Sequence, residues 1–107
     1  MALYLFQGSY TSASAAALVR KPQNRLRVIK AAVEKLGGSL EGGWMTFGKH
    51  DYAVICRFRD NATAASFAFA VAAGGAVAHN ETTPLLTFEE AMKATRRAAK
   101  AGYRPPR

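Results

Sequence analysis

The fold is decided by residues 47–58, which read FGKHDYAVICRF. Gly48 to Asp51 supply turn chemistry, and the β-rich, nearly apolar run from Tyr52 to Phe58 predicts a strand. Before the turn, Leu40 to Phe47 predicts another strand, with a bulge or close backbone approach at Gly42-Gly43. A hairpin therefore lies in the middle of the chain and joins its two halves.

Each half of the chain adds a strand and helical segments to this hairpin. The amphipathic pattern over Gln23–Leu36, stopped by Gly37-Gly38, indicates the clearest helix. Pro84 cannot donate to a hydrogen-bond ladder, so the last strand belongs at an edge of the sheet. Asp60-Asn61 offer an N-cap to a helix that has no charge and that we expect to be buried on most sides. The remaining predicted elements are strands over Ala2–Gly8 and Ala76–Leu86 and helices over Ala13–Arg20 and Ala62–Ala73.

A final helix follows the last strand. Thr87 to Glu90 match a capping box, in which a hydroxyl and a carboxylate cap the first helical turn. The order βαββαβ plus this helix predicts an α+β, ferredoxin-like domain over residues 1–101, with a four-stranded antiparallel sheet and helices on one face. A basic, proline-containing tail is predicted for residues 102–107. The face of the final helix that we expect to point inward consists of Phe88, Ala91, Met92, Thr95 and Ala99.

The first strand has apolar side chains on both of its faces. Leu3 and Leu5 alternate with Tyr4 and Phe6, and successive side chains of a strand point to opposite sides. The helices of one chain cover only one face of such a sheet, so the other apolar face needs a different cover. An identical sheet from a second copy is the economical candidate, and we predict a homo-oligomer.

Composition limits the class of protein. The chain has 107 residues, half of them apolar, which suffices for one core. No stretch has the sustained hydrophobicity of a membrane span, and Met1 to Gly8 does not resemble a secretory signal, so we expect a cytoplasmic protein without a membrane partner. Cys56 is the only cysteine, which excludes an intrachain disulfide and suggests a buried thiol.

Positive charge is the most unusual feature of the composition. The net charge of +8 favours small anions, nucleic acid or an acidic protein as partners. Much of it lies in Arg20–Lys35 and Lys93–Arg107, which are predicted helix faces and tail. Solvated helix faces account for such runs more often than a dedicated polyanion site does.

The sequence resembles that of the GYD-domain family, a group of small bacterial and archaeal proteins related to the dimeric α+β barrels. The resemblance covers roughly residues 3–95 and rests on Gly8 to Thr11, Arg25 to Gly38, Phe47 to Asp51 and the glycine before the last strand. It implies two ferredoxin-like sheets packed face to face in a dimer. The family hairpin typically reads Gly, any residue, Tyr, Asp, whereas His50 stands here where tyrosine is expected.

Six residues are candidates for binding a ligand. Tyr10, Trp44 and Tyr52 offer stacking surface and hydroxyl groups for a pocket, although each also fits core or interface packing. His50 and Asp51 form the most chemically suggestive pair, although turn and surface roles are the simpler interpretation. The sixth candidate, His79, shares a strand face with Glu81, as a two-ligand metal half-site would. Two ligands are too few to indicate a metal site, so we predict neither a metal nor a cofactor.

Three functions follow from these patterns. The leading one is a homo-oligomeric binding or assembly module whose pocket takes a small apolar or anionic metabolite. The second is a cofactor-independent enzyme of the monooxygenase type, a class that occurs among the related barrels, with His50 or His79 as the base near Tyr10 and Trp44. The third is a basic partner of nucleic acid or an acidic protein through Lys93–Arg107. No phosphate loop, nucleophile elbow or triad order is present, so no catalytic residue is assigned.

Overall fold

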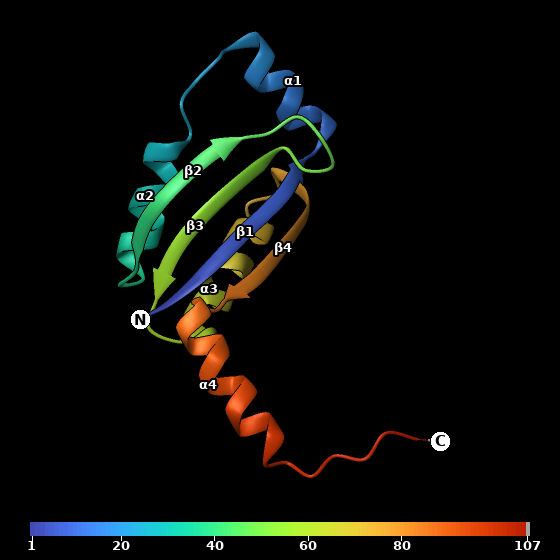
Figure 1. Cartoon of the computed structure of the whole chain (residues 1–107). Coiled ribbons are helices and arrows are strands. Elements are labelled where there is room, and N and C mark those ends of the chain that lie inside the picture. Colours follow the sequence, from blue (N-terminus) through green and yellow to red (C-terminus); the bar gives the residue numbers. More distant parts are fainter. Residues whose placement is uncertain (107) are drawn as a thin grey trace.

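The computed structural model describes residues 1–106, and Arg107, the last residue of the predicted tail, lies outside the described residues. Figure 1 shows a twisted sheet with helices behind it and one helix that leaves its lower end. The strands are β1 (Ala2–Tyr10), β2 (Ser39–Met45), β3 (Tyr52–Phe58) and β4 (Val77–Leu85). The helices are α1 (Ser12–Arg20), α2 (Leu26–Lys35), α3 (Asn61–Ala73) and α4 (Phe88–Ala99).

The sheet has the predicted ferredoxin-like topology. Its order is β2-β3-β1-β4, and all three neighbouring pairs are antiparallel. Pro84 pairs with Tyr4 on the edge strand β4, as its missing N–H requires. The β2 register shifts between Leu40 and Gly42, which confirms the predicted bulge. The α+β fold class is therefore confirmed.

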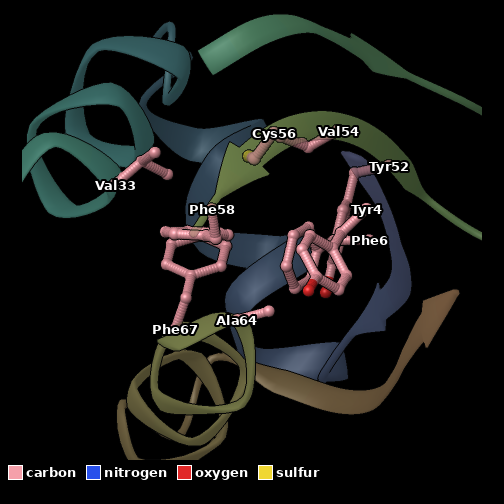
Figure 2. Close-up of a cluster of buried hydrophobic side chains, with 9 residues drawn as sticks. All are labelled: Tyr4, Phe6, Val33, Tyr52, Val54, Cys56, Phe58, Ala64 and Phe67. Carbon is pink, nitrogen blue, oxygen red and sulfur yellow. The ribbon is translucent and has the colours of Figure 1, made fainter. Parts of the chain in front are cut away.

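The core lies between the sheet and the helices α2 and α3. Tyr4 and Phe6 of β1 point to this side, and the ring of Phe6 meets the ring of Phe67 edge to face at 5.0 Å (Figure 2). The hydroxyl of Tyr4 donates to Asn61 Oδ1 at 2.6 Å, so this buried phenol does not lack a partner. Burying each large apolar side chain contributes about 1.5–3 kcal/mol, which makes this layer the main source of stability. The other buried members are Val33, Tyr52, Val54, Cys56, Phe58 and Ala64.

The opposite face of the sheet carries a second set of apolar side chains. Leu5 pairs with Ile55 across β1 and β3, and both alternate with the residues that enter the core. Leu3 and Ala53 lie on the same side. We call this surface the open face, because no helix of residues 1–106 covers it (Figure 1). The prediction of a sheet with two apolar faces is confirmed.

Two predictions about helices were wrong. The uncharged helix α3 was expected to be buried on most sides, yet within the described chain it buries only Ala64 and Phe67, and Phe69 is 72% exposed. The reason is that α3 packs on the sheet alone, with no further layer behind it. The helix predicted from Gln23 begins at Leu26, because the side chain of Asn24 accepts the backbone N–H of Leu26 and holds residues 24–26 in a turn.

The inward face predicted for the final helix was also wrong. The capping box at Thr87 is present, but no α4 residue is buried in the described chain, and Phe88 is 93% exposed. The helix starts directly beyond β4 and projects past the end of the sheet (Figure 1). Its apolar side chains therefore have no partner within residues 1–106.

A substitution at Gly8 tests the packing of the two central strands, β1 and β3. A methyl group added at this position would overlap the carbonyl oxygen of His79 and the hydroxyl of Tyr52. We expect Gly8→Ala to lower the free energy of unfolding by about 1–3 kcal/mol, the usual cost of overpacking. Urea denaturation monitored by circular dichroism measures it. Gly48→Ala, where an added methyl meets no atom of the described chain, is the matched control, and equal losses in both variants would contradict this account.

Candidate ligand-binding site

A cavity of about 310 Å³ lies between the sheet and the helices α2 and α3. Aromatic rings form much of its wall, from Phe6, Tyr10, Tyr52 and Phe67. The polar side chains other than the two phenols are those of Arg25 and Asn80. The remaining lining residues are apolar or small: Val28, Ile29, Ala32, Val54, Ala68, Ala70, Val71, Gly74, Ala76 and Val77.

A second cavity of about 430 Å³ adjoins the first, beneath β2 and the segment that precedes α2. Tyr10, Arg25 and Tyr52 line both cavities and so lie where the two meet. Trp44, which is largely exposed on the edge strand β2, borders only the second. Ile29 and Val54 also line both, so the shared wall holds a cation, two phenols and two apolar side chains on the helix side of the sheet.

The β2–β3 hairpin fixes the position of Tyr10. Asp51 Oδ2 accepts the backbone N–H of Tyr10 at 2.9 Å, and the backbone N–H of Asp51 donates to the Gly8 carbonyl at 2.7 Å. This double contact ties the hairpin to the end of β1, at the point where the β1–β4 register shifts. The rings of Tyr10 and Tyr52 then lie 5.7 Å apart and tilted by 47°. Asp51 thus has a backbone-anchoring role, and its carboxylate is not a free group in the cavity.

Burial raises the pKa of both phenols, which are protonated at neutral pH. It raises the pKa of Tyr52 to about 12, with a smaller contribution from Tyr10. Burial also raises the pKa of Tyr10, against the lowering effect of Arg25 and together with the raising effect of Asp51. The Tyr52 hydroxyl has no hydrogen-bond partner in residues 1–106 and lies close to the backbone of Gly8. Arg25 bonds Gln23 at 3.1 Å and has no carboxylate partner in the same residues.

The two histidines meet on the open face and not in the cavity. His50 Nε2 lies 3.1 Å from Glu81 Oε2, and His79 Nε2 lies 3.7 Å from Glu81 Oε1. The imidazole rings stack nearly parallel, with centroids 6.2 Å apart. The side chain of His50 is only 12% exposed, and its Nδ1 is buried without a partner in the described chain. Even so, residues 1–106 contain no group of three or more His, Cys, Asp or Glu able to hold a metal ion.

The six ligand-binding candidates chosen from the sequence do not all lie on the same face of the sheet. Tyr10 and Tyr52 lie in the cavity wall, and Asp51 anchors one of them. His50 and His79 lie across the sheet, so neither is placed to act as a base on a molecule in that cavity. Sequence reasoning missed Arg25 and Asn80. Arg25 stood among several basic residues of a predicted helix, and only its place at the N-cap, directly before α2, distinguishes it.

The fold and the helix-side cavity define a small α+β domain of the ferredoxin-like class. The model of the GYD domain matches residues 4–95, and the chain belongs to this family. No curated protein sequence matches it. One similar solved structure is 5-chloro-2-hydroxyhydroquinone dehydrochlorinase (TftG) from Burkholderia phenoliruptrix AC1100 in complex with 2,5-dihydroxybenzoquinone.

The likeness to that structure concerns the fold. The TM-score is 0.54 at 14% identity, over 78% of this chain and 93% of the other. Among residues 1–106, no helix is both long enough and apolar enough to cross a membrane.

The titration of Tyr52 tests the burial of the phenol. Because the folded pKa is raised from 10.0 to about 12, the neutral phenol contributes stability that is complete below pH 10 and is lost as the pH rises toward 12. NMR of tyrosine labelled with ¹³C at Cζ follows the ionisation directly. Between about pH 9 and about pH 11, Tyr52→Phe should lose less unfolding free energy than the wild type. A Tyr52 resonance that titrates near pH 10 would show an open, solvated ring.

Proposed function

We propose that the chain binds a small aromatic anion in the helix-side cavity and works as a homo-oligomeric α+β barrel. The observation that carries the proposal is that Arg25, an exposed cation with no carboxylate partner in residues 1–106, lines the same aromatic-walled cavities as Tyr10 and Tyr52. A guanidinium recognises a carboxylate or phenolate by charge-assisted hydrogen bonds. A largely apolar cavity with a few polar groups is typical of a small-molecule site.

The size and lining of the cavity support a single planar ring. Its volume of about 310 Å³ is at the lower end of the range for small-molecule pockets. Phe6, Tyr52 and Phe67 offer ring faces and edges for stacking. The acidic quinone in the TftG complex has this chemistry, which makes 2,5-dihydroxybenzoquinone a rational probe for this chain.

The open face supports self-association. Leu3, Leu5, Ala53 and Ile55 form a contiguous apolar surface that the chain's own helices leave uncovered. Monomeric proteins rarely keep such a surface in water when it covers the middle of a sheet. The same face of a second copy matches it in size and character, and packing the two sheets together encloses both.

A second candidate function is acid–base catalysis at the histidine cluster. The Glu81 carboxylate beside His50 Nε2 fixes the tautomer and orientation of that imidazole, as a general base requires. This site lies on the open face, so it would be enclosed between the two sheets of the proposed dimer. The cofactor-independent monooxygenase type remains the class of enzyme to which such a base would belong. Binding in the cavity is the better supported function, because two cavities meet at its polar groups.

Replacement of the positively charged Arg25 tests the ligand site. Benzoate and 2,5-dihydroxybenzoquinone, added to ¹⁵N-labelled protein, should shift resonances of Tyr10, Tyr52 and Phe67. Arg25→Gln should weaken binding of benzoate about 10-fold, because a hydrogen bond to a charged group is lost.

Arg27→Gln, in the first turn of α2 but outside both cavities, is the control and should bind as the wild type does. Benzamide, which lacks the charge, should bind Arg25→Gln and the wild type alike. Equal effects of the two arginine substitutions on benzoate, or shifts confined to other residues, would contradict this site.

Polar substitution of the open face tests self-association. We expect sedimentation equilibrium at micromolar concentration to show a dimer or higher oligomer for the wild type. Leu5→Gln combined with Ile55→Gln should shift it toward a folded monomer, because the buried apolar area of the interface is lost. Val19→Gln, a change at an exposed apolar residue of α1, should leave the oligomer unchanged. A wild-type monomer would refute the oligomer and leave the cavity proposal standing.

A further inference from the structure

The helix α4 carries an apolar surface that nothing in residues 1–106 covers. Its large members are Phe88, 93% exposed, and Met92, 55% exposed, which lie one turn apart on the same side. Ala91, Thr95 and Ala99 extend the same side along the helix, and we call these five residues the α4 stripe. The other side is basic, with Lys93, Arg96, Arg97 and Lys100. The helix is thus amphipathic yet unpartnered.

The start of α4 is firmly specified by local contacts. Thr87 Oγ1 accepts the Glu90 N–H at 3.0 Å, and Glu90 Oε1 accepts the Thr87 N–H at 2.9 Å. Glu89 and Glu90 lie in the first turn and Arg96 and Arg97 in the last, as the helix dipole favours. Twelve residues are still marginal for a helix in water without tertiary packing. The α4 stripe therefore needs a surface that the described part of its own chain does not provide.

We infer that α4 is an exchanged arm whose stripe packs on a second copy of this chain. This inference rests on the proposed homo-oligomer and identifies a further part of its interface. Leu85, the last residue of β4, pairs with Leu3 on the open face, and only two residues separate it from Phe88. The α4 stripe thus continues the edge of the open face. A second copy seated on that face is the nearest apolar surface the stripe can reach.

The direction of α4 favours the second copy over its own sheet. The backbone at Thr87 is extended, with φ −69° and ψ 159°, and the capping box holds this geometry at the helix start. The helix consequently leads away from the sheet, past its lower end (Figure 1). Its 12 residues span about 18 Å, enough to lie along the side of a partner domain.

The composition of the stripe favours a protein partner over a lipid surface. Phe88 and Met92 are its only large apolar side chains, and the rest of the stripe is alanine and threonine. A helix that lies in a membrane interface relies on a much larger apolar face. Small residues beside two large ones suit close packing against another protein surface. The basic side of α4 then stays in solvent at the rim of the dimer.

Paired glutamine substitutions test the arm in the full-length protein. Phe88→Gln with Met92→Gln should raise the dimer dissociation constant at least about 10-fold in sedimentation equilibrium, because burial of two large side chains is lost. Glu89→Gln with Lys93→Gln introduces two glutamines on the solvent-facing side of α4 without changing the net charge. This control variant should leave the dimer dissociation constant unchanged. Circular dichroism checks that both variants keep α4.

A spin label shows which copy α4 contacts. The label is attached at Arg97→Cys, on the basic side of α4, in protein without ¹⁵N. This protein is mixed with ¹⁵N-labelled wild type; the natural Cys56 is buried. Line broadening in the ¹⁵N-labelled copy supports exchange between copies. In a second sample the spin-labelled protein itself carries ¹⁵N and is diluted into excess unlabelled wild type. Broadening of the open face in this sample, with none in the first, would show that α4 folds back on its own copy, and would overturn the inference.

The remaining outcomes separate this inference from the proposed oligomer. If the stripe variant dimerises normally while the Leu5→Gln, Ile55→Gln variant does not, the oligomer stands and the arm is refuted. A wild-type monomer refutes both. If α4 resonances broaden only when phosphatidylglycerol vesicles or a DNA duplex are added, the partner is a lipid surface or nucleic acid, and the inference is again overturned.

Discussion

The rest of the structure depends on the alternation of side chains along β1, one of the two central strands. Tyr4 and Phe6 point to the helices and build the core, while Leu3 and Leu5 point to the open face. A strand has only these two sides, and each of them is apolar here. Two helices cover one side with Val33, Ala64 and Phe67 and leave the other without a cover. The position of the cavity, the proposed second copy and the proposed role of α4 all follow from this imbalance.

The sheet separates the chemistry of the molecule into two places. On the helix side, Arg25, Tyr10 and Tyr52 meet where two cavities join. On the open face, His50 and His79 stack beside Glu81. The β2–β3 hairpin links the two places, because His50 faces one of them and the next residue, Asp51, anchors the end of β1 for the other. A change in the hairpin therefore affects both sites through the backbone.

Local signals predicted most of the architecture. The turn chemistry of residues 48–51, the missing donor of Pro84 and the capping box at Thr87 act over a few residues and are visible in the sequence. What could not be predicted depends on distant partners. The amphipathic pattern of α4 predicts a partner surface, but not that residues 1–106 leave its apolar side uncovered. The contact of His50 with Glu81 was missed because the direction of a hairpin side chain is set by bonds from Asp51 to β1.

His50 also shows where this chain departs from its family. The family hairpin typically has tyrosine at this position, and here the imidazole instead lies beside Glu81 with its ring against that of His79. Both contacts are with β4, so the substituted side chain couples the hairpin to the edge strand from which α4 starts. The helix-side residues do not take part in this coupling. The cavity is therefore the feature to compare across the family, while the histidine cluster belongs to the way this particular chain shapes its open face.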